Sequence, residues 1–147
     1  MKSDERPYEV LIIGNYVPQL ESLQSTLIEN GFLARILNSE IDKLDTIQQI
    51  NPDVIILYFN RSNNDEISIC KMIRDDTNIP VLVVASDNKT GMVEKTLDAG
   101  ADEYLVKPIS EKVLFAYIKT LSRRSRFEEE AKNNITEHFP TKVISQN

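Results

Sequence analysis

The chain has very few of the residues that build disulfide frameworks or zinc sites. Its 147 residues include one cysteine, Cys70, and one histidine, His138. One cysteine excludes an internal disulfide framework and fits a reducing cytosol, and the two residues leave no His/Cys cluster for zinc. Long apolar runs are absent too, and the first seven residues are charged rather than apolar. We therefore expect a cytoplasmic protein with neither a signal peptide nor a membrane span.

Positive charge is outnumbered by negative charge. There are 17 lysines and arginines against 23 aspartates and glutamates, a net charge of -6. This balance argues against a dedicated nucleic-acid surface and favours a protein partner. With 41% hydrophobic residues, the chain has the size of one ordinary domain and can bury a core without disulfides or metals. We expect one domain followed by a tail.

What the sequence does contain is an alternation of short apolar segments with amphipathic ones. Unbroken apolar runs of this length are typical of strands buried on both faces of a parallel sheet. The expected strands are residues 8–13, 32–37, 54–57, 81–85 and 104–106. Each is followed by apolar residues at three- and four-residue spacing, as in Leu20, Leu23 and Leu27, which predicts a helix. Five strand-then-helix repeats predict an α/β fold: a flavodoxin-like, (βα)5 doubly wound parallel five-stranded sheet in three layers.

Two side-chain environments follow from this helical spacing. Cys70 lies on the apolar face of the third helix, so we expect an inert thiol in the core. The arginines of residues 123–126 are interpreted as solvated charges near a helix end.

The last helix is predicted from Ser110 to about Lys132. The domain boundaries are accordingly 8–121 for the domain and 122–147 for an extended last helix and flexible tail or linker.

The residue at the end of the third strand matters most for function. Ligands and chemistry in open α/β sheets sit at the carboxyl ends of the central strands. Tyr58 occupies that position after the run of residues 54–57, and its side chain is bulky and neutral.

Three phrases of the sequence resemble the receiver domain of two-component response regulators. They are Pro-Asp-Val-Ile-Ile-Leu at 52–57, Ile-Pro-Val-Leu-Val-Val-Ala at 79–85 and Ala-Gly-Ala-Asp-Glu-Tyr-Leu-Val-Lys-Pro at 99–108, and the resemblance covers about residues 8–121. In that family an aspartate ending strand three accepts a phosphoryl group from a histidine kinase. Two acidic residues after strand one hold Mg²⁺, a threonine or serine ends strand four, and a lysine ends strand five.

This sequence departs from the family pattern at most of those positions. Gly14 and Asn15 fall on the acidic pair, Tyr58 on the phosphoacceptor, and Ala85 on the Thr/Ser position. Lys107 is retained. Ser86 is one residue past the hydroxyl position and should point to the other face of the strand, so we expect it to be a poor substitute. Tyr104 matches the family's switch aromatic.

The chemistry of the family explains what these departures imply. A carboxylate and a phosphoryl group repel each other unless a divalent metal bridges them, and the acidic pair supplies that metal. We therefore expect a pseudo-receiver with no catalytic, metal or cofactor site, which is not an enzyme. The Tyr58 ring should fill the vacated pocket beside the stem of Lys107. A receiver with remodelled phosphoacceptor chemistry at the Tyr58 hydroxyl remains an alternative, although a phenol with a pKa near 10 is a poorer acceptor.

Lys107 and Tyr104 each have two interpretations. Lys107 either keeps a family role or is a structural lysine, in solvent or paired with Asp87 or with the loop at Asp65. Tyr104 is either a rotamer switch, as in the family, or a half-buried strand aromatic with its hydroxyl in water.

The resemblance also implies a partner surface. It would comprise helix four, strand five and helix five, including residues 88–95, Tyr104 and residues 109–117. A second copy of the chain is a further candidate partner, which would pair through residues 122–132. If the chain does not dimerise, these residues form a linker or a frayed terminus.

An alternative class of function is a small-molecule, flavin-type binder. Residues 14–19, however, lack the hydroxyl-rich phosphate loop that flavin modules use and the histidine that corrinoid modules use.

Overall fold

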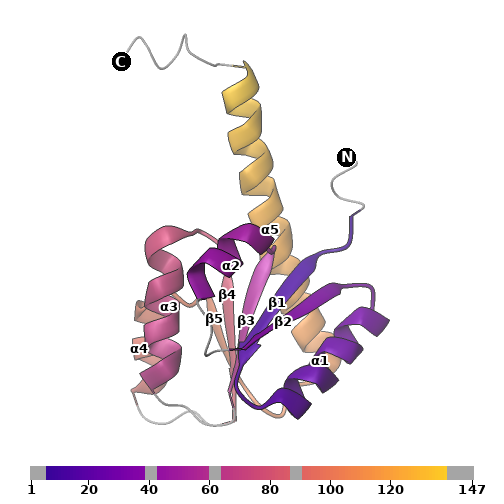
Figure 1. Ribbon diagram of the computed structural model, residues 1–147, viewed down its shortest axis with the longest axis vertical. Helices are drawn as coiled ribbons and strands as arrows, with labels where there is room; N and C mark the ends of the chain where they lie inside the picture. Colours follow the sequence, from indigo (N-terminus) through magenta and orange to yellow (C-terminus); the bar gives the residue numbers. More distant parts are fainter. Residues whose placement is uncertain (1–5, 39–42, 60–63, 87–90, 139–147) are drawn as a thin grey trace.

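The computed structural model describes residues 6–38, 43–59, 64–86 and 91–138, which form one parallel sheet flanked by helices (Figure 1). Five strands pair in the order β2-β1-β3-β4-β5. This confirms the predicted (βα)5 doubly wound fold. The elements are β1 (Glu9–Gly14), α1 (Val17–Glu29), β2 (Leu33–Asn38), α2 (Lys43–Ile50), β3 (Val54–Phe59), α3 (Asn64–Asp76), β4 (Val81–Ala85), α4 (Met92–Asp98), β5 (Glu103–Val106) and α5 (Glu111–His138).

Helices cover both faces of the sheet. Side chains alternate along each strand, so Val10 and Ile12 pack under α1 and α5, whereas Leu11 and Ile13 pack under α2 and α3. The central strand β3 is therefore apolar without interruption, and its residues from Val54 to Leu57 are completely buried. The resulting three layers place the carboxyl ends of all five strands at one edge of the sheet.

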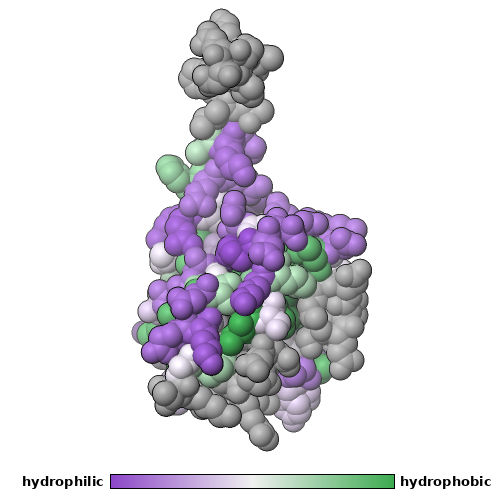
Figure 2. Space-filling model, turned by 90° about the vertical axis from the view of Figure 1, so that its left-hand side faces the viewer, coloured by the Kyte–Doolittle hydropathy of each residue, from purple (hydrophilic) through white to green (hydrophobic). Residues whose placement is uncertain are grey.

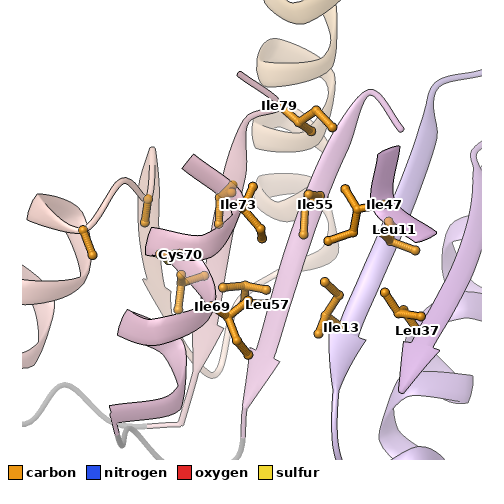
Figure 3. Packing of buried hydrophobic residues seen from close by; sticks show 14 of the residues in the cluster. Leu11, Ile13, Leu37, Ile47, Ile55, Leu57, Ile69, Cys70, Ile73 and Ile79 are labelled. Carbon is orange, nitrogen blue, oxygen red and sulfur yellow. The ribbon is translucent and has the colours of Figure 1, made fainter. Parts of the chain in front are cut away.

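Cys70 lies in the core on the second of these faces. Figure 3 shows it on α3 beside Ile69 and Ile73, facing Leu57 of β3. The side chain is buried, which confirms the predicted core position.

Helix α5 is longer than the sequence predicts. It continues to His138, six residues past the expected end at about Lys132, and extends well beyond the sheet (Figure 1). Asn133 and Asn134 do not end it because each costs a helix only a few tenths of a kcal/mol, by rough estimate, relative to better helix formers. In the described part of the chain, neither α5 nor another helix is apolar over a length that could cross a membrane. Of the tail predicted after about Lys132, residues 139–147 lie outside the described residues.

The interpretation of Arg126 as a solvated charge is wrong. Its side chain is buried and pairs with Asp53, with Nη2 3.0 Å from Oδ2 and Nε 3.2 Å from Oδ1. The guanidinium also donates to the carbonyl oxygens of Arg6 and Pro7 at 2.9 and 2.6 Å and lies 4.6 Å from the ring centroid of Tyr8. The packed part of α5 therefore extends at least to Arg126, past the boundary predicted at residue 121.

Candidate functional site

The predicted site residues of β1, β3, β4 and β5 gather at the carboxyl edge of the sheet. Gly14 ends β1, Tyr58 is the penultimate residue of β3, Ala85 ends β4, and Lys107 follows β5. The backbone N–H of Lys107 donates to the carbonyl oxygen of Ala85 at 2.8 Å, which fixes the start of the chain after β5. The peptide bond from Lys107 to Pro108 is cis.

Tyr58 and Lys107 contact each other directly. The Lys107 Nζ lies 3.8 Å from the centroid of the Tyr58 ring, a cation–π contact in which the ammonium group, and not only its stem, meets the ring. In the described ranges, no carboxylate forms an ion pair with Lys107. The two expected partners, Asp87 and the Asp65 side chain, lie outside the described residues.

Burial shifts the pKa values of both side chains of this pair. Desolvation raises the pKa of the Tyr58 phenol above its usual value and lowers the pKa of the Lys107 ammonium below its usual value. The phenol is therefore neutral at physiological pH, which makes it a weak nucleophile.

Ser86, not Ala85, shares the site with these two residues. Tyr58 is opposite Val84 in the register of β3 and β4, so its ring lies on the face that Val84 and Ser86 also present. A pocket of about 620 Å³ is lined by Tyr58, Ser86 and Lys107, whereas Ala85 is buried elsewhere. Ser86 therefore points to the other face of the sheet from Ala85, as predicted, and this is the face on which the Tyr58 ring lies.

Gly14 lies at a tightly packed position as well as lacking a carboxylate. It is buried where β1 meets β3, and a Cβ placed on it would lie 2.5 Å from the carbonyl oxygen of Tyr58 and 2.8 Å from Cδ2 of Leu20. Contacts below 3.0 Å require something to shift, and the oxygen belongs to the backbone of the central strand. The structure thus excludes any side chain here without a backbone shift. Asn15, the second position of the pair, is exposed.

Tyr104 lies on the other face of the sheet from Tyr58 and Lys107. It is half-buried and packs against the cluster of α2 and α3 residues, opposite Val83 of β4. This position fits the half-buried strand aromatic of the two interpretations.

Sequence reasoning missed the contribution of α1 to the pocket. Gln19, Ser22 and Thr26 line it together with Leu23. The signal was present, because these polar residues recur at three- and four-residue spacing next to the apolar stripe of α1.

Sequence reasoning also missed two ion-pair clusters at the opposite, amino-terminal edge of the sheet. Asp53, before β3, holds Arg126, and Asp102, before β5, accepts from Arg74 and Arg124 at 3.2 and 3.0 Å. Arg124 and Arg126 therefore fasten α5 to the edge of the sheet that lies away from Tyr58.

The sheet order β2-β1-β3-β4-β5, with a lysine directly after β5, is the arrangement that the three sequence phrases led us to expect for a receiver domain. The family model "Response regulator receiver domain" matches residues 10–119. The chain therefore belongs to the response regulator receiver domain family of two-component systems.

Individual relatives agree with this assignment. The chain is 29% identical over 125 residues to the response regulator MprA of Mycobacterium avium, covering 84% of this chain and 55% of the relative. The chain thus spans about half the length of the curated relatives it matches. Among solved structures, it is similar to a two-component response regulator from Clostridium difficile, with a TM-score of 0.69 and 29% identity over 80% of this chain and 97% of the other.

A more distant structure shows the same fold. The receiver domain of a sensor histidine kinase from Pseudomonas aeruginosa, solved with a magnesium ion coordinated in its active-site cleft, has a TM-score of 0.68 at 18% identity. It covers 79% of this chain and 98% of its own.

Proposed function

We propose that this receiver domain signals by contact with another protein, without aspartyl phosphorylation and without Mg²⁺. The observation that carries the proposal is the packing of Gly14. The position that supplies a metal-binding carboxylate in the family has no space for a side chain below the Tyr58 carbonyl. Loss of the first carboxylate of the acidic pair is therefore favoured by the close contact between β1 and β3.

The remaining donors do not suit a magnesium ion. Mg²⁺ prefers several hard oxygen ligands in octahedral geometry, usually with one or two carboxylates among them. Gly14 offers no side chain, Asn15 offers one neutral amide oxygen, and the Tyr58 phenol stays protonated.

The same observations argue against phosphoryl transfer to the Tyr58 hydroxyl. A neutral phenol needs a base to activate it, whereas the charged group that contacts the Tyr58 ring in the described residues is a cation. The pair is better suited to packing: the ring and the ammonium fill the space of the acidic site and stabilise each other.

The proposed contact surface comprises α4, β5 and α5. As the edge strand, β5 has one unpaired side, and all four of its residues are half-exposed. Leu97 of α4 and Val113 of α5 are apolar and exposed by 40% and 45%. Figure 2 looks at this side of the molecule and shows apolar residues among hydrophilic ones. Residues 88–90 of the predicted surface lie outside the described residues.

A charge placed on this surface tests the contact. We expect Leu97→Glu to abolish recovery of the partner in a pull-down, because a buried unpaired carboxylate is costly in an apolar interface. The matched control is Lys71→Glu on the exposed side of α3. A partner that is retained equally by both variants contradicts the proposed surface.

A second copy of the chain is the candidate partner for the distal part of α5. Phe127 is 71% exposed there, an unusual position for a phenylalanine unless another surface covers it. Light scattering of the chain should give the mass of a dimer, which Phe127→Ser reduces to a monomer and Glu128→Gln leaves intact. A wild-type particle with the mass of one chain would remove the dimer.

A beryllofluoride titration tests the absence of phosphoryl chemistry. With Mg²⁺ and beryllofluoride, we expect no saturable change in the amide NMR signals of Asn15, Ser86 and Lys107. A saturable change in these amides that Lys107→Met weakens would overturn the proposal, because such a change reports a phosphoryl analogue bound at the family's site. Lys107→Met is the matched control for nonspecific binding of the ions.

A further inference from the structure

A pocket opens between α1 and α5 next to the Tyr58–Lys107 pair. Its volume of about 620 Å³ is within the usual range of small-molecule sites. Leu23, Val84 and Leu114 give it an apolar wall. Gln19, Ser22, Thr26, Ser86 and Lys107 add polar groups around that wall. An apolar pocket with a few convergent polar groups is the usual form of a ligand site.

One cation in the pocket has no ion-pair partner within the described residues. The Lys107 ammonium lies over the Tyr58 ring, and no carboxylate in the described part of the chain forms an ion pair with it. The ring offsets only part of the free energy that burial of the ammonium group costs, as the lowered pKa of Lys107 indicates. An anion placed beside this ammonium would therefore gain a charge-assisted hydrogen bond.

One acceptor at the pocket also has no donor. The Oε1 atom of Gln19 is buried and has no hydrogen-bond partner. A buried acceptor without a donor is costly, and a ligand that supplies an N–H or O–H group removes that cost. Gln19 is on α1 and Lys107 follows β5, so the unpaired amide oxygen and the ammonium group line the pocket from different elements.

We propose that this pocket binds a small organic carboxylate that has an apolar body and at least one N–H or O–H donor. The carboxylate meets the Lys107 ammonium, the body lies along Leu23 and Leu114, and the donor satisfies Gln19. Glu111 also lines the pocket and repels a second negative charge, so a singly charged carboxylate fits better than a phosphate ester.

This inference goes beyond the proposed function and connects to it. Ile109 and Leu114 line the pocket and also belong to the proposed partner surface at α5. An occupied pocket would therefore bias the position of α5, where the partner is proposed to bind. A domain without phosphoryl chemistry would in this way still receive an input next to its former acceptor position.

The test uses the full chain labelled with ¹⁵N and three probes. These are 4-hydroxyphenylacetate, its neutral amide 4-hydroxyphenylacetamide, and phenyl phosphate. At millimolar concentrations, we expect saturable shifts of the Gln19, Ser86 and Lys107 amides with the carboxylate. The carboxylate should bind at least about tenfold more tightly than the amide, which is worth about 1.4 kcal/mol. Phenyl phosphate should bind more weakly than the carboxylate.

Variants separate a built site from nonspecific binding. Lys107→Met should remove the preference for carboxylate over amide and leave amide binding unchanged, whereas Lys71→Met on the opposite face should change nothing. The proposal is overturned if the carboxylate causes no saturable shift, binds no better than the amide, binds more weakly than phenyl phosphate, or is unaffected by Lys107→Met. None of these results bears on phosphorylation, so the proposed function stands or fails separately.

Discussion

Replacing Gly14 by alanine adds one methyl group, and the structure predicts a large effect. The new Cβ would lie 2.5 Å from the Tyr58 carbonyl oxygen, about 0.9 Å short of ordinary van der Waals contact at 3.4 Å. The second close contact, at 2.8 Å from Leu20, involves a side-chain methyl group that is itself buried. The carbonyl cannot retreat easily because Ile56 and Leu57 beside it are fully buried in the central strand.

We expect Gly14→Ala to lower the free energy of unfolding by about 2–3 kcal/mol, the upper part of the range for overpacked sites. For a chain of this length, the melting temperature should fall by about 5–10 °C. Urea denaturation and calorimetry measure both quantities. Where space allows, a glycine-to-alanine change stabilises by about 0.4–1 kcal/mol, so even the sign of the effect is informative.

The matched control is the exposed neighbour, Asn15→Ala, which should change stability by no more than about 0.5 kcal/mol. If Gly14→Ala proved as stable as this control, the close approach of β1 and β3 would not exist. A carboxylate at position 14 would then be sterically allowed, and the proposal would lose its main support.

Three further predictions concern the clusters at the two edges of the sheet. Arg126→Met should destabilise the chain by about 3 kcal/mol in urea, because it leaves the partly buried Asp53 carboxylate without its cation, whereas the exposed Arg123→Met should have little effect. A chain ending at residue 132 should be as stable as the full chain, whereas one ending at residue 121 should lose at least as much free energy of unfolding as Arg126→Met does. Equal stability of the two truncated chains would show that α5 does not fasten the domain. Burial raises the pKa of Tyr58, so its folded value exceeds the unfolded value near 10, and wild type should lose stability relative to Tyr58→Phe as the pH rises above about 10. Urea denaturation at a series of pH values measures that difference, and a difference that stays constant contradicts the raised pKa.

The strands and their order of appearance were predictable because their signal is local. An unbroken apolar run such as residues 54–57 needs a sheet covered on both faces, and the structure covers β3 in that way. The end of the first helix is likewise a local property, because Gly31, with a φ of 94°, follows just after α1 ends.

The features that were missed depend on contacts between distant segments. The sequence shows that Gly14 brings no carboxylate, but not that the Tyr58 carbonyl lies 2.5 Å from where a Cβ would be. The face shared by Ser86 and Tyr58 depends on the register of β3 and β4. Arg126 follows Ile118 and Ser122 at four-residue steps, which is the spacing of a buried helix face. We nevertheless interpreted Arg126 as solvated because of its charge, since arginine is rarely buried unless it is paired.

The proposal that this receiver has lost phosphoryl chemistry is tested most directly by intact-mass spectrometry after incubation with acetyl phosphate and Mg²⁺. Wild type and Tyr58→Asp should be compared, because the variant restores the family's acceptor while Gly14 and Asn15 still provide no acidic pair. We predict that neither protein gains a phosphoryl group. A gain of a phosphoryl group in either protein would contradict the proposal. In Tyr58→Asp that gain should disappear on treatment with hydroxylamine, because an acyl phosphate would then have formed without the metal-binding carboxylates.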